Sequence, residues 1–581
     1  MTKRFRALIA GFAGVVLVAT ACTQGGGGPQ TSQTPAASEK PQQGGKIIEG
    51  DTSDIATMNP ILVNDTRSRR VVQLIYDDLI QADPKTGEPK PRLATFSISQ
   101  DGLTYSYEIN SKANWSDGKP IIAQDWLTGL MTVGKSQLTV RKSSFKDVQG
   151  FLDYCVGSST SGCKGTAKTI SGVKIDTANP KKFSVTMSKV TCSAIIDLNG
   201  YILPTQVFGK YVTDSSKDEI DTAPENLSPQ VFSGPFKFTE WRKGDQVIMS
   251  KNADYWQGAP NVDQYVFKVV ANATAIANGL KTGELTFSNQ VQAKDLADLQ
   301  THVDTLNITK FPSLGYRFIG WNTSSPQAPG LADKRVRQAL AYGLDMDSII
   351  KSVVFGEATA HVAHHVPVQW AYPDVSLEPY KFDQTKAKQL LKDAGWTAGS
   401  DGFLTKDGKK FSLTISTSSD DQQNITTAQV AAEQYKQLGI DAKAAPEAFQ
   451  GLVTKLTSGD PVLDATIIGW SLGTEPDPYQ IWHSSQIPDR AKGTTGFGFT
   501  FFKDPAMDSA IEAARNPTNG DCSIATRKKN YETFNKILND QQPYNFGYVP
   551  NILAVSQKTL QGFAPASFAT VYNVYQWWIK Q

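Results

Sequence analysis

Residues 464–479, DATIIGWSLGTEPDPY, constrain the fold more than any other stretch of the chain. The short run of β-forming apolar residues at its start is typical of a buried strand, which we expect to end at Gly469 and Trp470. The loop that follows is rich in glycine and proline and carries two carboxylates, Glu475 and Asp477. Open α/β folds bind ligands where strands end, so this stretch predicts a binding edge. The alternative is a core position for Trp470 and solvated acids.

The N-terminus has the features of an export signal. Three basic residues precede an uncharged apolar segment, residues 12–20, and small residues stand before Cys22. This arrangement predicts a signal peptide at residues 1–21. The cysteine directly after it resembles the lipidated cysteine of a bacterial lipobox, with Ala19 where leucine is commonest, so we expect a lipid anchor on Cys22. The alternative is an ordinary cleaved signal and an unmodified Cys22. Residues 22–45 have no large apolar side chain and predict a flexible tether.

The composition of the chain is that of an ordinary globular protein. With 581 residues, 40% of them hydrophobic, the chain is long enough for two or more lobes. A net charge of +2 gives no electrostatic footprint for nucleic acid. No internal apolar run reaches the roughly 18 residues that a membrane-spanning helix needs.

Four cysteines remain after Cys22, and export permits disulfides between them. Cys155 and Cys163 flank a short flexible segment, VGSSTSG, and we expect them to pair. Cys192 and Cys522 are far apart, and the sequence leaves their pairing open. No CxxC pair is present, so neither a zinc site nor a redox motif is expected.

Alternating hydrophobic residues predict two β-hairpins. The first covers residues 93–109 with a turn at Asp101-Gly102, and the second covers residues 233–250 with a turn at residues 243–245. Apolar residues at helical spacing predict a helix over residues 69–80.

Several of these segments resemble signatures of the family 5 extracellular solute-binding proteins, the oligopeptide, dipeptide and nickel receptors of ABC importers. LATFSISQDGLTYSYEINSKANWSDGKPIIAQDW and GPFKFTEWRKGDQVIMSKNADYWQGAP are similar to its two N-terminal signatures. DKRVRQALAYGLD and AKQLLKDAGW are similar to two later helices, in the family's order. Several long motifs in order specify a family better than one short pattern does.

The resemblance implies an α/β fold, a two-lobed periplasmic-binding-protein-like clamshell with an extra subdomain in lobe 1. Ligand would bind between the lobes, and closure would bury it. The implied bounds are 46–310 for lobe 1, with the extra subdomain at about 76–190, 311–553 for lobe 2, and 554–581 for the return to lobe 1.

The resemblance also points to candidate ligand contacts. A buried peptide amine needs a carboxylate, and many peptide-binding relatives place an aspartate soon after the Gly-Trp pair. That position is Gly473 here, so the acid is missing, and Glu475 or Asp477 would have to replace it. For the loop after the first strand, an ordinary helix N-cap is the alternative. The candidates are Gly469, Trp470, Gly473, Glu475 and Asp477 in the opening loop, Val63, Asn64 and Asp65 after the first strand, and Trp321 near the hinge.

The implied function is that of a monomeric, lipid-anchored receptor on the extracytoplasmic face of the cell membrane, in the periplasm or at the cell surface. It would capture oligopeptides and deliver them to the permease of an ABC importer, without a cofactor. The alternatives are a receptor of the same fold for a nickel chelate, haem or oligosaccharide, and a surface lipoprotein that senses a peptide signal.

Two further patterns argue against metal binding and catalysis. His361, His364 and His365 lie close in sequence, but Glu357 is the one additional ligand nearby, so we expect no metal site. HExxH is absent from the sequence, and no carboxylate pair is marked as a catalytic dyad, so we do not expect an enzyme.

Overall fold

The computed structural model describes residues 40–139, 141–157, 162–199, 201–213, 219–459, 463–492 and 496–581. The expected signal peptide, the lipidation site Cys22 and most of the expected tether lie outside these ranges. Among the described residues, no helix is both long and apolar enough to cross a membrane.

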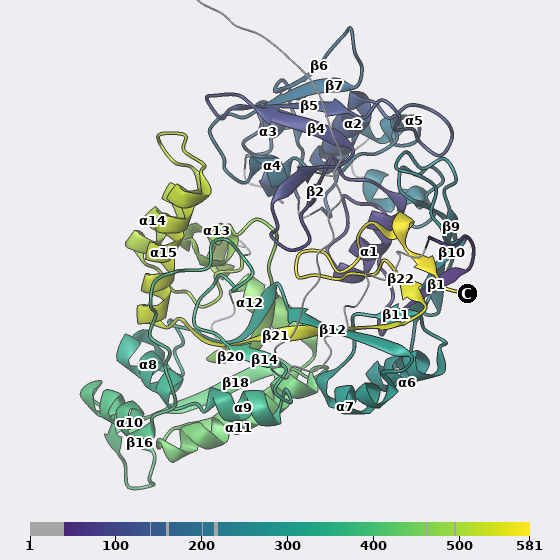
Figure 1. Cartoon of the computed structure of the whole chain (residues 1–581). Helices are drawn as coiled ribbons and strands as arrows, with labels where there is room; N and C mark the ends of the chain where they lie inside the picture. The colour runs from purple at the N-terminus through teal and green to yellow at the C-terminus, as the bar shows by residue number, and fades with distance from the viewer. Residues whose placement is uncertain are drawn as a thin grey trace, which may run out of the picture. The chain divides into compact units, whose positions relative to one another are not determined.

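A mixed twelve-stranded sheet runs through the described residues in the order β19-β18-β20-β13-β21-β11-β1-β10-β9-β8, and β12 and β14 also pair with β21 (Figure 1). We call the part built on β1 lobe 1 and the part built on β20 lobe 2. The strands of lobe 1 are β1 Lys46–Asp51, β8 Phe236–Arg242, β9 Gln246–Lys251, β10 Gln264–Val269, β11 Phe287–Ser288 and β12 Leu306–Pro312. Those of lobe 2 are β13 Gly315–Trp321, β14 Ala358–Ala360, β18 Ser412–Ser418, β19 Asp441–Glu447 and β20 Ala465–Ser471.

One long strand, β21 (Tyr544–Gln557), belongs to both lobes. Its first half pairs with β13 of lobe 2, and its second half pairs with β11 and β12 of lobe 1. The chain also crosses between the lobes at residues 313–314, between β12 and β13. These two crossings are the backbone connections about which the lobes can bend.

A separate four-stranded sheet, in the order β4-β5-β7-β6, forms a subdomain of lobe 1. Its core stacks the ring of Phe183 on Tyr107 at 5.0 Å and on Trp126 at 4.9 Å. The first predicted hairpin is confirmed as β4 and β5, and the second as β8 and β9. The subdomain strands are β4 Ala94–Ile98, β5 Thr104–Ile109, β6 Val173–Ile175 and β7 Lys182–Thr186.

The remaining strands form short ladders, and α-helices flank the sheets. The short strands are β2 Ile80–Ala82 with β3 Pro89–Pro91, β15 Thr397–Ala398 with β16 Leu404–Lys406 and β17 Lys409–Lys410, and β22 Leu560–Gln561 with β23 Trp578–Ile579. The α-helices are α1 Thr66–Ile75, α2 Ala123–Lys135, α3 Phe151–Tyr154, α4 Ala194–Asp197, α5 Thr205–Phe208, α6 Ala273–Thr282, α7 Leu296–Leu299, α8 Lys334–Tyr342, α9 Met346–Ser352, α10 Gln384–Asp393, α11 Gln422–Gln437, α12 Phe449–Ser458, α13 Tyr479–Trp482, α14 Pro505–Arg515 and α15 Ile524–Gln541.

The first helix is shorter than its hydrophobic spacing predicts. The spacing continues to Ile80, but α1 ends at Ile75 and Ile80 begins β2. The carbonyl of Ile75 accepts hydrogen bonds from the backbone N–H groups of Ser233 and Gly234, at 3.1 and 3.0 Å. A distant segment thus takes up the acceptor that would otherwise continue the helix.

The predicted strand at the start of residues 464–479 is confirmed as β20, but it runs past Gly469 and Trp470 to Ser471. The strand continues because β13 pairs with it along its whole length, with Gly469 opposite Arg317. A side chain at position 469 would collide with the guanidinium of Arg317, so glycine lets that arginine cross the strand.

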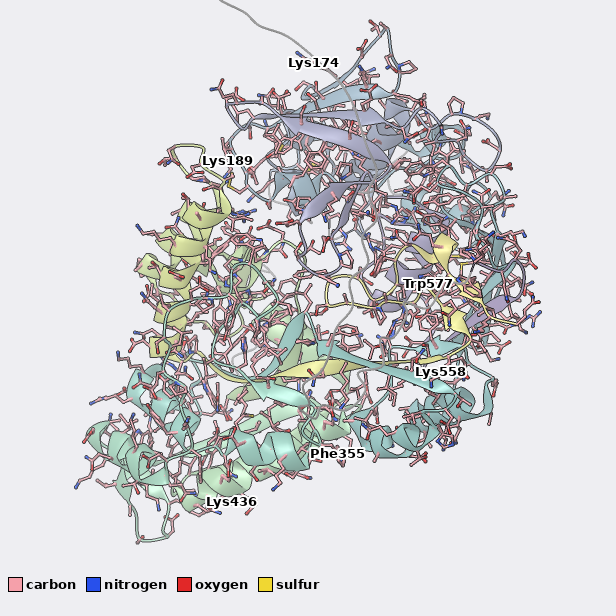
Figure 2. All side chains as sticks on the ribbon, viewed as in Figure 1. Lys174, Lys189, Phe355, Lys436, Lys558 and Trp577 are labelled. Atoms are coloured by element: carbon pink, nitrogen blue, oxygen red, sulfur yellow. A yellow bond between two sulfur atoms is a disulfide. The ribbon has the colours of Figure 1, made fainter. Side chains whose placement is uncertain are left out.

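The C-terminal segment packs back onto lobe 1 (Figure 2). Trp577 is buried, with its ring 5.6 Å from that of Phe287 in β11 and 5.1 Å from that of Phe563. Disulfides join Cys155 to Cys163 within the subdomain and Cys192 to Cys522 across 330 residues of sequence.

Candidate functional site

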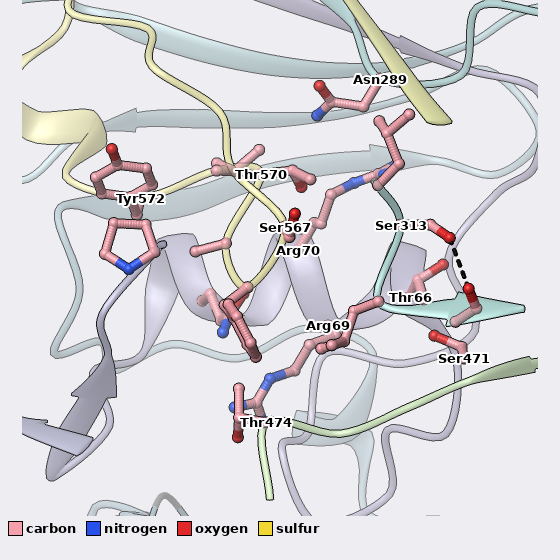
Figure 3. A pocket seen from close by; sticks show the side chains of 18 of the residues that line it. Thr66, Arg69, Arg70, Asn289, Ser313, Ser471, Thr474, Ser567, Thr570 and Tyr572 are labelled. Carbon is pink, nitrogen blue, oxygen red and sulfur yellow. Dashed lines mark hydrogen bonds between the residues drawn. The ribbon is translucent and has the colours of Figure 1, made fainter. Parts of the chain in front are cut away.

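A cavity of about 1590 Å³ lies between the two lobes. Lobe 1 contributes residues 63–66, one face of α1 and residues 289–293, and the C-terminal segment contributes residues 567–575. Lobe 2 contributes the start of β13 and residues 470–474 at the end of β20. Figure 3 shows this arrangement, with Arg69 and Arg70 of α1 on the same cavity as Ser471 and Thr474 of lobe 2.

Five of the nine predicted ligand contacts line the cavity. They are Val63, Asn64, Asp65, Trp470 and Gly473. The other four, Gly469, Glu475, Asp477 and Trp321, are not part of its wall.

Trp470 is held at the cavity edge by an aromatic stack. Its ring lies 6.2 Å from that of Phe318 and 5.9 Å from that of Phe499, nearly parallel to both. Its indole N–H donates to the hydroxyl of Tyr544 at 3.2 Å. One edge of the indole therefore packs on lobe 2, while the residue still forms part of the cavity wall.

The two acids of the opening loop face arginines of lobe 2 instead of the cavity. Glu475 pairs with Arg527 of α15, and the carboxylate of Asp477 lies 3.1 Å from Nε of Arg515 at the end of α14. Burial raises the pKa of Glu475, and the Arg527 guanidinium opposes this shift. These contacts fix the loop to the α14–α15 hairpin.

Trp321 is a core residue in this structure. Its side chain is fully buried, and its ring lies 6.2 Å from that of Tyr435 in α11. Proximity to the hinge in sequence is a poor guide here, because both faces of β13 are covered.

Of the three neighbouring histidines, His365 contacts the same loop. Nε2 of His365 lies 2.8 Å from the carbonyl oxygen of Pro476, and Nδ1 accepts from the side-chain amide of Asn535 at 2.9 Å. Nδ1 of His364 lies 3.0 Å from the hydroxyl of Tyr316. Burial lowers the pKa of His361 to about 3 and that of His365 to about 4, so both rings are neutral at pH 7. Within the described ranges, no group of three or more His, Cys, Asp or Glu residues is arranged to hold a metal ion.

Most charged groups on the lobe 1 wall are already paired. The carboxylate of Asp78 lies 3.0 Å from Arg69, and that of Asp77 lies 2.6 Å from Arg92. Arg70 pairs with Glu49 at 2.8 Å and with Asp51. Pairing removes these groups as free anchors for a charged ligand.

Asp65 and Arg141 differ from the other charged groups of this wall. One carboxylate oxygen of Asp65 caps α1 by accepting from the N–H of Ser68 at 2.8 Å, and the other has no hydrogen-bond partner among the described residues. Nη2 of Arg141 donates to the carbonyl of Val63 at 2.6 Å, while its Nε is unpartnered within the same residues. The wall thus combines one anionic and one cationic group without ion pairs in the described chain.

Sequence reasoning missed Arg141, residues 289–293 and residues 567–575. Arg141 precedes a 3₁₀ turn in the subdomain, and no motif marks it. Residues 567–575 reach the cavity only because the chain returns to lobe 1 after β21. The family resemblance implies that the C-terminal segment returns to lobe 1. No local sequence pattern shows that this segment lines the cavity, because its position depends on the tertiary fold.

The sequence matches the profile of the bacterial extracellular solute-binding proteins, family 5 (middle), over residues 88–489. The chain belongs to this family. It is 29% identical to the oligopeptide-binding protein AppA of Bacillus subtilis (strain 168) over 569 residues, 97% of this chain and 96% of AppA. It is 26% identical to the oligopeptide-binding protein OppA of Lactococcus lactis subsp. lactis (strain IL1403), over 71% of this chain and 69% of OppA.

Solved structures share the two-lobed fold of this chain. AppA from Bacillus subtilis in complex with a nonapeptide superposes with a TM-score of 0.74 and 28% identity, over 93% of this chain and 100% of AppA. NikZ from Campylobacter jejuni in complex with Ni(L-His) gives a TM-score of 0.73 at 24% identity, over 92% of this chain and 99% of NikZ. Proteins of one fold thus hold chemically different ligands, and the ligand has to be argued from the cavity.

Proposed function

We propose that this family 5 protein captures peptides in the cavity between its lobes and delivers them to a membrane ABC importer. The observation that carries the proposal is the size and lining of the cavity. Its volume of about 1590 Å³ exceeds the roughly 300–1,000 Å³ of ordinary small-molecule pockets. A ligand of several residues fills such a space, and AppA, a relative along nearly the whole chain, is a peptide-binding protein.

The charged groups of the cavity suggest how a peptide is oriented. Gly473 supplies no carboxylate, and Glu475 and Asp477 are occupied by arginines. Asp65 is the cavity acid without an ion pair among the described residues, so we assign it to the ligand's positive group. Arg141, which has no ion pair in the same residues, is assigned to the ligand's carboxylate.

Trp470, Gly473, Val63 and Asn64 complete the proposed site. The indole of Trp470 offers a flat apolar wall for ligand side chains, and the backbone around Gly473 and Val63 offers hydrogen bonds that are independent of ligand sequence. Such a site tolerates many peptides, because recognition depends on main chain and termini more than on side chains.

The proposed setting is the extracytoplasmic face of the bacterial membrane. The N-terminal signal and Cys22 support lipid anchoring, and residues 22–45 supply a tether long enough to reach a neighbouring permease. The protein acts as a monomeric receptor and catalyses no reaction. The lobes close around the ligand because the closed form makes ligand contacts that the open form lacks. The permease then recognises the closed form.

Thermal-shift titration of the full chain tests this proposal. Peptides of two to nine residues are expected to raise the melting temperature by mass action. Asp65→Asn, which keeps the helix cap, is expected to weaken the binding of peptides with a free amine. Arg141→Gln is expected to weaken the binding of peptides with a free carboxylate. The proposal fails if no peptide shifts the melting temperature while nickel–histidine, haem or an oligosaccharide does.

A further inference from the structure

The disulfide between Cys192 and Cys522 joins the two lobes directly. Cys192 lies in the lobe 1 segment between β7 and α4, and Cys522 lies in the loop between α14 and α15 of lobe 2. Their Cα atoms are 5.3 Å apart. Figure 1 shows α4 and the tip of the α14–α15 hairpin away from β21, the strand that connects the lobes. A covalent bond at this place adds a third connection to the two backbone crossings.

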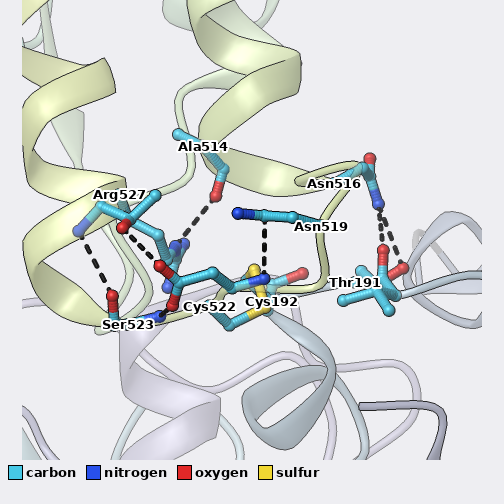
Figure 4. The surroundings of a disulfide bond; sticks show 12 residues. Thr191, Cys192, Ala514, Asn516, Asn519, Cys522, Ser523 and Arg527 are labelled. Atoms are coloured by element: carbon cyan, nitrogen blue, oxygen red, sulfur yellow. Dashed lines mark hydrogen bonds between the residues drawn. A yellow bond between two sulfur atoms is a disulfide. The ribbon is translucent and has the colours of Figure 1, made fainter. Parts of the chain in front are cut away.

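Hydrogen bonds surround the disulfide and bridge the same two segments (Figure 4). The N–H of Cys192 donates to the carbonyl of Arg515 at 3.0 Å. The side-chain amide of Asn516 donates to the carbonyl of Val190 at 2.8 Å and to the hydroxyl of Thr191 at 3.3 Å. Figure 2 places Lys189, the residue before Val190, beside the tip of the α14–α15 hairpin.

The lobe 2 end of this connection is anchored in packed structure. Nε of Arg527 in α15 donates to the carbonyl of Ala514 in α14 at 3.0 Å, which ties the two helices together. Asp521, beside Cys522, accepts from the N–H of Ser523 at 2.9 Å and fixes the loop to the start of α15. A displacement of Cys522 would therefore also move α14 and α15.

The lobe 1 end is anchored as well. The hydroxyl of Tyr105 in β5 donates to the carbonyl of Thr191 at 3.3 Å. The hydroxyl of Thr191 donates to the carboxylate of Asp147 at 3.4 Å. Cys192 itself is 7% exposed. Neither cysteine sits on a free loop that would absorb a separation of the lobes.

We propose that the Cys192–Cys522 disulfide is a reversible covalent latch that limits how far the two lobes open. Disulfide-linked Cα atoms stay within about 6.8 Å, so the present 5.3 Å leaves roughly 1.5 Å of further separation at this point. Hinge opening of a two-lobed binding protein moves its lobe tips much farther than that. With the bond intact, ligand exchange therefore proceeds through a restricted opening. With the bond reduced, the bridging hydrogen bonds alone hold the tips together.

The latch opens by exchange with an external dithiol. A thiolate of the dithiol attacks Sγ of Cys522, which is the more exposed partner, and Cys192 leaves as a thiolate that takes up a proton. The second sulfur of the dithiol then displaces Cys522, which also ends as a thiol. Two electrons and two protons pass to the protein, and the dithiol becomes a disulfide. Oxidation by the reverse steps closes the latch.

Small-angle X-ray scattering and hydrogen exchange of the ligand-free full chain test the latch. Neither readout needs a ligand, so the outcome is independent of whether the ligand is a peptide. The Cys192→Ser/Cys522→Ser variant is expected to have a larger radius of gyration than the wild type. Cavity amides of residues 470–474 and 289–293 are expected to exchange about tenfold faster or more. The Cys155→Ser/Cys163→Ser variant, which lacks the disulfide within lobe 1, is the matched control and is expected to change neither quantity.

The wild type treated with dithiothreitol supplies a second route that does not depend on folding of the variant. Reduction is expected to reproduce the variant's scattering while the far-ultraviolet circular dichroism stays unchanged, and reoxidation is expected to restore the original curve. An unchanged radius of gyration and unchanged cavity exchange after verified cleavage of Cys192–Cys522 would overturn the proposal.

Discussion

The carboxylate of Glu475 pairs with the guanidinium of Arg527, 52 residues later in the chain, and this pair lies outside the wall of the interlobe cavity. The two side chains are 15% and 6% exposed, respectively. The pair connects the loop after β20 to α15, so Glu475 holds the loop that presents Trp470 and Gly473 to the cavity.

Loss of this ion pair is expected to reduce stability without removing a ligand contact. Glu475→Gln leaves the largely buried Arg527 without its counter-charge, so the free energy of unfolding should fall by about 2–4 kcal/mol, as measured by urea denaturation. Glu433→Gln is the matched control. Its exposed pair with Lys436 should contribute less than about 1 kcal/mol. Equal losses in the two variants would contradict the structural role of Glu475.

A carboxylate at position 473 is expected to add an anchor for the ligand's amine, in addition to Asp65. A Cβ atom there would meet nothing closer than the carbonyl oxygen of Glu475 at 3.7 Å, so Gly473→Asp fits without strain. Its charged hydrogen bond should tighten the binding of free-amine peptides by about tenfold, as measured by calorimetry. N-acetylated peptides and the Gly473→Asn variant should show no such gain. A gain that is the same for acetylated peptides would place the ligand's amine elsewhere.

The part of this architecture that the sequence predicts is either local or shared with the family. Both hairpins were predictable because the alternation and the turn lie within one segment. The pairing of Glu475 with Arg527 was not, because nothing near either residue marks its partner. Trp321 shows a different limit. A strand buried on both faces carries no alternation, so its sequence cannot tell a cavity-facing side chain from a core one.

The protein is expected to become less stable as the pH rises and Asp197 of α4 loses its proton. Burial, together with the nearby carboxylates of Asp477 and Glu475, raises the pKa of Asp197 to about 7, while Arg515 opposes the shift. The folded state therefore holds a proton that the unfolded state loses near pH 4, and the free energy of unfolding should fall between about pH 4 and pH 7. Since Asp197 keeps some exposure to solvent, we expect a fall of about 1–2 kcal/mol.

Asp197→Asn tests this assignment. The amide is neutral at every pH and can still accept the hydrogen bond that Ser193 donates at 2.7 Å. Urea denaturation at pH 5 and pH 8 should show a smaller decrease for the variant than for the wild type. A decrease of the same size in both proteins would assign the pH dependence to other groups.

His365 is expected to act in the opposite direction, making the protein less stable in acid. Burial lowers its pKa to about 4, so below about pH 6.5 the unfolded state binds a proton that the folded state excludes. Stability should therefore fall as the pH drops from 6.5 towards 4. His365→Gln, which can still donate to the carbonyl of Pro476, should make thermal unfolding less sensitive to acid. An unchanged acid sensitivity would mean that this ring is protonated in the folded protein.

Native mass spectrometry is the most direct measurement of whether the interlobe cavity holds peptides. The full chain is incubated with a mixture of peptides of two to nine residues, nickel–histidine and haem, and the intact complexes are weighed. We expect mass increments that match peptides, at one ligand per chain, and we expect these increments to disappear on competition with an excess of a single bound peptide. Increments of nickel–histidine or haem, with none from peptides, would contradict the proposal that the cavity holds peptides.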